Sequence, residues 1–187
     1  MSIDELLSEV EKLNALHRKH ASFFQWHDKA IQEFGIAQDF VDQFEKICGE
    51  KVVHIARGSD PPDIIIRTEA EHSIGIEITE LVDEDAIKFQ IAGDARYFER
   101  VVHWNDENIR EKIIQIVQRK DRLCAKAALI YDELLLLIFT DEPKLRVNAL
   151  MRATDGVQWP KTGAISQAYI IVGYDPSVGT KAVIQLF

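Results

Sequence analysis

Two short runs of β-branched residues, 64–66 and 74–78, constrain the fold of this chain more than any other feature. A polar, turn-like segment over residues 68–73 separates them. β-branched residues favour strands and short polar spacers favour turns, so the pattern predicts a β-hairpin. Asp63 follows a proline at the start of the first strand, and Glu77 lies in the second. We therefore expect the Asp63 carboxylate to reach across to Glu77.

Helical periodicity predicts helices on both sides of this hairpin in the chain. An N-terminal arm over residues 1–34 carries apolar residues at helical spacing, and Gly35 is expected to interrupt it. A second helix should end at Gly49, because glycine readily adopts the left-handed conformation that ends helices. A later helix should begin at Asn105 or Asp106, since either side chain can cap its first turn.

Further strands are expected before and after that later helix. The candidates are residues 51–56, 134–139, 167–174 and 181–187. Residues 134–139 are all apolar, which predicts a central strand buried on both faces. Residues 84–104 keep no single period and receive no assignment. Helix, three strands, helix and strand is therefore the predicted order of the core.

Length and composition favour one domain. A chain of 187 residues with 47% hydrophobic content can bury one sizeable core but is short for two. We expect a helical arm over residues 1–34, a core over 36–140 and a C-terminal extension over 141–187. No apolar run reaches membrane-spanning length, and acidic residues occupy the N-terminal region where a signal peptide would be basic. A cytoplasmic protein without a membrane partner is expected.

Charge and cysteine content exclude some functional classes. The net charge of −9 excludes attachment to nucleic acid through a global basic field. Residues 110–126 hold six basic and two acidic residues, which is either a solvated helix face or a local contact surface. Cys48 and Cys124 lack metal-ligand spacing and fall among apolar positions of predicted helices, so buried free thiols are expected.

Pro62-Asp63, thirteen intervening residues and then Glu77-Ile78-Thr79 resemble the motif of the restriction-endonuclease-like PD-(D/E)XK nuclease superfamily. That motif is Pro-Asp, a spacer, Asp or Glu, any residue, and Lys. The resemblance covers residues 36–140 and implies an α/β fold with an αβββαβ core, in which helices flank a mixed sheet. The helical arm and the C-terminal strands would be additions to this core. Thr79 replaces the motif lysine and cannot supply its positive charge.

The resemblance also implies a metal site. Asp63, Glu77 and the backbone carbonyl of Ile78 would hold Mg²⁺ or Mn²⁺, both of which prefer oxygen ligands. Thr79 could only hydrogen-bond the attacking water or a metal ligand. Glu45, on the preceding helix, could reach the metal through water as first-helix acids do in similar nucleases, or it could be a surface glutamate.

Lys120 is the candidate to replace the motif lysine. At 100° per residue it falls within the apolar stripe formed by Ile109, Ile113 and Val117. A lysine in such a stripe either extends past the helix end or meets a carboxylate inside the protein. In some members of the superfamily the catalytic lysine lies on the helix after the motif strand, which implies a catalytic role for Lys120. A structural ion pair is the alternative.

Two functions remain open from the sequence. The first is a Mg²⁺-dependent nuclease that hydrolyses phosphodiester bonds of DNA or RNA, as the resemblance implies. The second is a catalytically inactive protein of the same fold, which acts as a binding or immunity-type module. The apolar stripe of the N-terminal arm would pack on the core or join two copies of the chain in a homodimer.

Overall fold

The computed structural model of the chain describes residues 29–83, 104–126, 131–142, 145–173 and 181–187, together with Asp175 and Val178. The expected arm lies outside the described residues up to residue 28, and so does the homodimer contact proposed for it. Residues 84–103, which received no assignment, also lie outside them.

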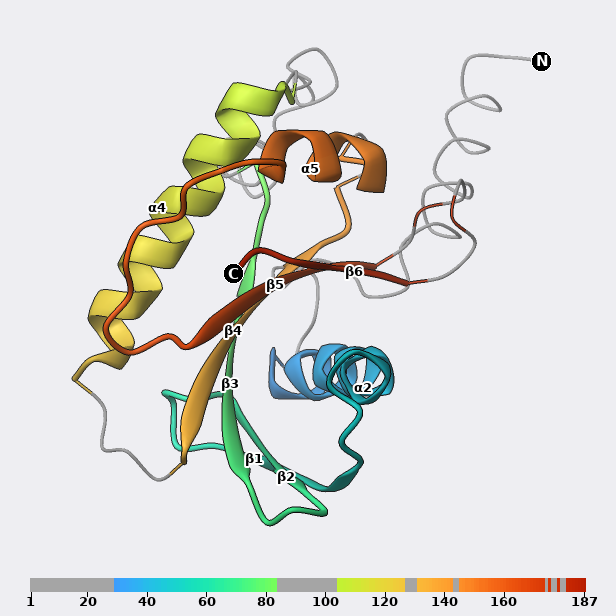
Figure 1. Ribbon diagram of the computed structural model, residues 1–187, viewed down its shortest axis with the longest axis vertical. Coiled ribbons are helices and arrows are strands. Elements are labelled where there is room, and N and C mark those ends of the chain that lie inside the picture. Colours follow the sequence, from blue (N-terminus) through green and yellow to red (C-terminus); the bar gives the residue numbers. More distant parts are fainter. Residues whose placement is uncertain are drawn as a thin grey trace.

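Three helices and one six-stranded sheet make up the described fold (Figure 1). The helices are α2 (Lys29–Cys48), α4 (Asp106–Cys124) and α5 (Val147–Thr154). The strands are β1 (Val52–Arg57), β2 (Ile64–Thr68), β3 (Ser73–Glu80), β4 (Glu133–Thr140), β5 (Gln167–Val172) and β6 (Ala182–Gln185). They pair in chain order, with β3–β4 and β4–β5 parallel and the other pairs antiparallel. The predicted α/β fold, its mixed sheet and the αβββαβ core order are confirmed.

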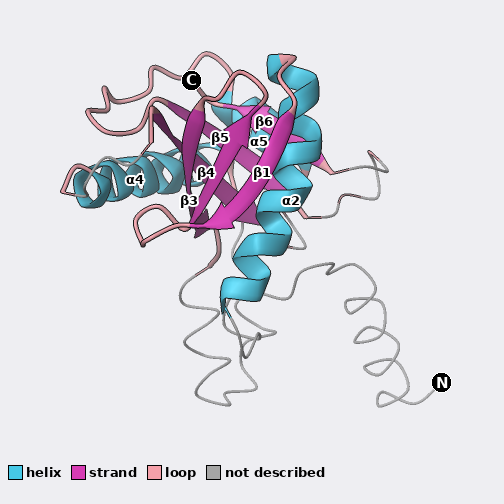
Figure 2. Ribbon diagram, turned by 90° about the horizontal axis from the view of Figure 1, so that it is seen from below, coloured by secondary structure: helices cyan, strands magenta, loops and turns pink. Residues whose placement is uncertain are grey.

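Helices cover both faces of the sheet (Figure 2). On one face α2 packs Phe40 against Tyr169 of β5, with ring centroids 5.2 Å apart. On the other face α4 and α5 enclose a second apolar cluster that includes Ile113 and Leu150. Alternate side chains of residues 134–139 pack into this cluster and into the apolar cluster under α2. Strand β4 is therefore buried on both faces, which confirms the predicted central strand. Each fully buried aliphatic side chain contributes about 1.5–3 kcal/mol to stability.

The structure corrects part of the helix prediction. Helix α2 continues through Gly35 instead of stopping there. A glycine inside a helix costs about 1 kcal/mol, and complete burial of the adjacent Ile36 and Ala37 outweighs that cost. Gly49, with φ of 74°, ends the helix as predicted. Cys48 in the last turn is exposed and not buried as expected, whereas Cys124 is buried.

Helix α5 was not predicted. Its buried residues are Val147, Leu150 and Ala153, which recur every third position and pack on the same cluster as α4. This spacing was the available signal, but eight residues are short for a pattern to be distinctive. The C-terminal extension therefore contributes one helix and two strands.

Among the described residues, no helix combines the length and the apolar character that crossing a membrane requires.

Asn105 begins α4 with a reciprocal capping box. Its side chain accepts a hydrogen bond from the Asn108 backbone at 2.8 Å, and the Asn108 side chain accepts one from the Asn105 backbone at 2.9 Å. Two N–H groups are thereby satisfied at a helix end that would leave them without partners. Of the two caps that the sequence allowed, Asn105 is the one used.

We expect Asn105→Ala to lower the free energy of unfolding by about 1 kcal/mol, because the alanine cannot accept the bond from Asn108. Asn105→Gly should cost only a few tenths of a kcal/mol, since glycine leaves the N–H groups open to water. Urea denaturation of both variants would measure the difference. Equal losses for the two substitutions would contradict a capping role.

Candidate metal centre

A closed loop holds two aspartates at the start of β2. The Gly58 N–H donates to the Asp63 carbonyl at 2.8 Å, and the Asp60 N–H donates to the Pro62 carbonyl at 3.1 Å. A Cβ atom at Gly58 would lie 1.9 Å from the Pro62 carbonyl oxygen, so only glycine allows this approach. On its other side, Pro62 packs over Gly75 of β3. The loop is thus fixed to its own strand and to the neighbouring one.

Strand register brings Asp63 and Glu77 together. Ile64 pairs with Ile76 in the antiparallel β2–β3 ladder, and one further step places Asp63 opposite Glu77. Residues that face each other in such a ladder project on the same side of the sheet. The Asp63 Oδ2 atom also accepts a hydrogen bond of 2.7 Å from the Ile78 N–H. The expected approach of the two carboxylates is therefore present.

Asp60 completes a cluster of three acids. One carboxylate oxygen each from Asp60, Asp63 and Glu77 lie within 4.8 Å of one another. Asp63 and Glu77 are buried and Asp60 is exposed, so the cluster opens to solvent on the Asp60 side. Asp60 was not among the predicted site residues, although it belongs to the same Asp-Pro-Pro-Asp segment. Its place depends on the closed loop, which the sequence pattern did not specify.

Lys120 extends from α4 into this cluster. Its Nζ atom lies 2.5 Å from Glu77 Oε1 and 3.4 Å from the backbone carbonyl oxygen of Ile78. The lysine side chain is 17% exposed, so its ammonium is largely removed from bulk solvent. Of the two outcomes that the helical wheel allowed, the inward contact with a carboxylate is the observed one.

The next residue on α4, Asp121, fixes the position of that helix. Its carboxylate accepts hydrogen bonds from the backbone N–H groups of Gly163, Ala164 and Ile165. Burial would raise the pKa of Asp121, but these three donors outweigh it and lower the pKa. The segment before β5 is therefore attached to the last turns of the helix that carries Lys120.

Glu77 is incompletely satisfied in this arrangement. Its Oε2 atom is buried and has no hydrogen-bond partner among the described residues. Burial raises the pKa of Glu77, and the Asp63 charge raises it further, while the bond from Lys120 lowers it without offsetting the other two. Ionisation of this carboxylate is therefore less favourable in the folded protein than in water, and a further cation would favour it.

Glu33 is a fourth acid near the cluster, and the sequence prediction missed it. It lies on α2, is buried, and forms an ion pair of 2.7 Å with Lys29. Burial raises the pKa of Glu33 first, and the nearby Asp63 raises it as well, although Lys29 opposes both effects. The sequence analysis assigned residue 33 to a separate N-terminal arm, because the helix was expected to break at Gly35. Glu33 was therefore not considered as part of the core site.

Glu45 does not join the cluster. Its Oε1 atom accepts a hydrogen bond of 2.8 Å from the Val52 backbone. Val52 pairs with Thr68 at the far end of β2 from Asp63, and Glu45 lies about 18 Å along the helix from Glu33. A water bridge from Glu45 to a metal at the acids is therefore out of reach. The sequence allowed a water-mediated metal contact or a surface position for Glu45. Neither interpretation included its hydrogen bond to the first residue of β1.

Thr79 lies two residues after Glu77 in β3 and is buried. By strand alternation it projects toward α4, the same side as Glu77.

The charged cluster as a whole holds four carboxylates and two ammonium groups. The carboxylates belong to Asp60, Asp63, Glu77 and Glu33, and the ammonium groups to Lys29 and Lys120. The cluster carries two net negative charges when all six are ionised, which is the charge that one divalent cation would neutralise.

No family model matches the chain, and no curated protein or solved structure does either. The site is therefore defined by its geometry. It is an acidic triad in a mixed α/β sheet, with a lysine ammonium beside one of the acids, and it could hold a metal ion.

We expect Gly58→Ala to lower the free energy of unfolding by about 1–3 kcal/mol, because the added methyl group overlaps the Pro62 carbonyl. Gly163→Ala is a matched control, since a Cβ atom there meets nothing within 4 Å. Thermal or urea unfolding of the two variants provides the comparison. Equal stability of both variants would show that the loop closes differently.

We expect Glu77→Gln to raise the free energy of unfolding of the metal-free protein at pH 7. The folded state raises the pKa of Glu77 above the usual 4.5, so it binds this proton more tightly than the unfolded chain does. The contribution of Glu77 to stability therefore falls as the pH rises from about 4.5 through the folded-state pKa. The advantage of the glutamine variant should shrink as the pH is lowered toward 4.5. Urea unfolding across this range would detect it, and an advantage that grows toward acid pH would contradict the assignment.

Proposed function

We propose that this chain is a metal-dependent phosphodiesterase of the PD-(D/E)XK type that acts on DNA or RNA. The observation that carries the proposal is the convergence of Asp60, Asp63 and Glu77 oxygens within 4.8 Å, with the Lys120 ammonium 2.5 Å from Glu77. Carboxylates and an ammonium group are the components that similar nucleases bring to one end of a sheet. The Pro-Asp and Glu-Ile-Thr residues of the motif supply two of the three acids.

The residues present fit Mg²⁺ or Mn²⁺. All the candidate ligands are oxygens, from the three acids and the Ile78 carbonyl, and both ions prefer oxygen ligands. The Glu77 Oε2 atom, buried without a hydrogen-bond partner among the described residues, offers one unused ligand position. A divalent ion would lower the pKa of a bound water and so supply a nucleophile near neutral pH.

The chain's own residues would then position the substrate and balance its charge. The Lys120 ammonium, held by Glu77 and the Ile78 carbonyl, could hydrogen-bond the attacking water or offset negative charge on the phosphate. Thr79 projects from the same face of β3 and could orient that water, but it cannot add a charge. Glu33 and Lys29 form an ion pair beside Asp63, which fixes its surroundings.

The proposed substrate class rests on the site and on α4, because the protein as a whole is acidic. The exposed residues Arg119 and Arg122 lie on the same helix as Lys120 and could contact phosphates locally. Such a local surface would bind nucleic acid weakly and with strong salt dependence. A homodimer formed through the N-terminal arm remains part of this proposal.

A second candidate function, an inactive binding module, is favoured by one observation. The Lys120 ammonium contacts both Glu77 and the Ile78 carbonyl, two of the positions that a metal would need. A lysine held there partly neutralises Glu77 without any metal, and Thr79 supplies no second cation. In this alternative the cluster is structural, and removing Lys120 would change stability alone.

Metal binding and cleavage together separate the two candidates. We expect titration calorimetry to detect Mn²⁺ binding to the unaltered chain and to detect none in Glu77→Gln. We also expect Mn²⁺-dependent cleavage of single-stranded DNA, double-stranded DNA or RNA, and a loss of roughly 10²-fold or more in Lys120→Met. Lys46→Met is the control, because this lysine is exposed in the last turn of α2 and lies outside the cluster.

Two results would contradict the phosphodiesterase. One is a folded protein that binds no Mn²⁺ at millimolar concentration. The other is Mn²⁺-dependent cleavage that Lys120→Met and Glu77→Gln both retain, since this would place the activity elsewhere. Metal binding without cleavage of any of the three substrates would favour the binding module.

A further inference from the structure

A pocket lies apart from the acidic triad, at the opposite end of the sheet from the start of β2 and on the face that α2 covers. It has a volume of about 280 Å³ and opens between the end of α2 and the first residues of β3, β4 and β5. Its inner wall is apolar, formed by Phe44, Ile74 and Tyr169, and these residues belong to the α2-side core. Ligand sites commonly combine such a wall with a few polar groups at the mouth.

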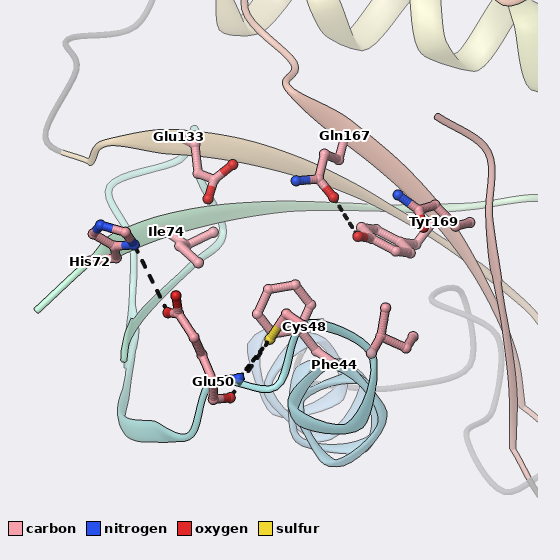
Figure 3. A pocket seen from close by; sticks show the side chains of 10 residues that line it. Phe44, Cys48, Glu50, His72, Ile74, Glu133, Gln167 and Tyr169 are labelled. Atoms are coloured by element: carbon pink, nitrogen blue, oxygen red, sulfur yellow. Dashed lines mark hydrogen bonds and ion pairs between the residues drawn. The ribbon is translucent and has the colours of Figure 1, made fainter. Parts of the chain in front are cut away.

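The mouth of this pocket is acidic. The carboxylates of Glu50 and Glu133 both point into the space between α2 and the sheet, from opposite sides (Figure 3). His72 Nδ1 lies 3.9 Å from Glu50 Oε2, a long distance for an ion pair, and the two side chains are 60% and 42% exposed. Within the described parts of the chain, no lysine or arginine lines the pocket. The two carboxylates therefore face a pocket whose described lining contains no lysine or arginine.

The environment of Tyr169 is consistent with this negative potential. Its hydroxyl group donates a hydrogen bond of 2.5 Å to Gln167 Oε1. Burial raises the pKa of the phenol, and the nearby Cys48 and Glu133 raise it further. The phenol thus stays protonated and keeps Gln167 in place at the rim.

We propose that this pocket binds a small organic cation, an ammonium compound with a compact apolar body. The apolar part would enter against Phe44, Ile74 and Tyr169, and the ammonium group would remain at the mouth between Glu50 and Glu133. Charge attraction at a partly desolvated mouth selects for the cation over neutral molecules of the same shape. This site lies apart from the acidic triad and does not depend on the proposed phosphodiesterase activity.

A series of three compounds tests the proposal on the unaltered chain. Benzylammonium is the cationic probe, benzyl alcohol its neutral analogue and benzoate its anionic analogue. In heteronuclear NMR titrations, we expect benzylammonium to shift the amide signals of Ile74 and Tyr169 and to bind at least about fivefold more tightly than benzyl alcohol. Benzoate should not bind. Equal affinities for the cation and the alcohol would overturn the proposal.

Variants then locate the cation. Glu50→Gln and Glu133→Gln should each weaken benzylammonium binding about threefold to fivefold, whereas Glu111→Gln, an exposed position on α4, should leave it unchanged. Glu77→Gln should also leave it unchanged. Binding that survives both pocket substitutions, or that disappears in Glu77→Gln, would refute this location.

Cys48 offers an independent readout, because its exposed thiol lines the pocket. The other cysteine, Cys124, is buried, and burial raises its pKa to about 11, so it should react far more slowly. Saturating benzylammonium should slow alkylation of Cys48 by iodoacetamide, and benzyl alcohol at the same concentration should protect less. An unchanged alkylation rate with bound benzylammonium would count against this pocket.

Discussion

The buried carboxylate of Glu77 is the constraint to which the surrounding residues respond. A carboxylate inside a sheet loses its hydration, and folding tolerates that loss only where cations or hydrogen-bond donors replace the water. Lys120 supplies one such cation, and the Asp121 contacts hold its helix in place. The remaining Glu77 oxygen has no hydrogen-bond partner in the part of the chain that the structure describes. Lys120 thus offsets only part of the cost of burying this carboxylate, and the arrangement leaves a place for a further cation.

The residues that could be predicted from the sequence were those set by short-range periodicity. The hairpin register follows from alternation and a short turn, so Asp63 and Glu77 were expected to approach each other, and they do. The inward direction of Lys120 follows from its phase on an amphipathic helix. In each case a single repeating geometry links the residue to its neighbours, and no long-range information is needed.

The residues that escaped prediction depend on contacts between distant segments. Glu33 reaches Asp63 because α2 crosses the sheet as one continuous helix. The sequence around Gly35 does not predict that the helix continues through this position. Asp60 joins the triad because Gly58 allows the chain to fold back onto Pro62. Tertiary burial outweighs local propensity at Gly35, and a sequence pattern cannot report how much burial a helix will gain.

The hydrogen bond from the Ile78 N–H to Asp63 has a consequence for how such sites change in evolution. This side chain occupies the place of a backbone acceptor and so extends the β2–β3 ladder by one bond. Replacing it would leave a buried N–H without an acceptor, a penalty that applies whether or not the protein catalyses anything. A lineage that lost catalysis would still be under selection to retain this aspartate for folding. The presence of Asp63 in a related sequence would therefore be poor evidence of activity. The exposed Asp60 forms no such side-chain bond in the ladder, so its presence or loss would be more informative about function.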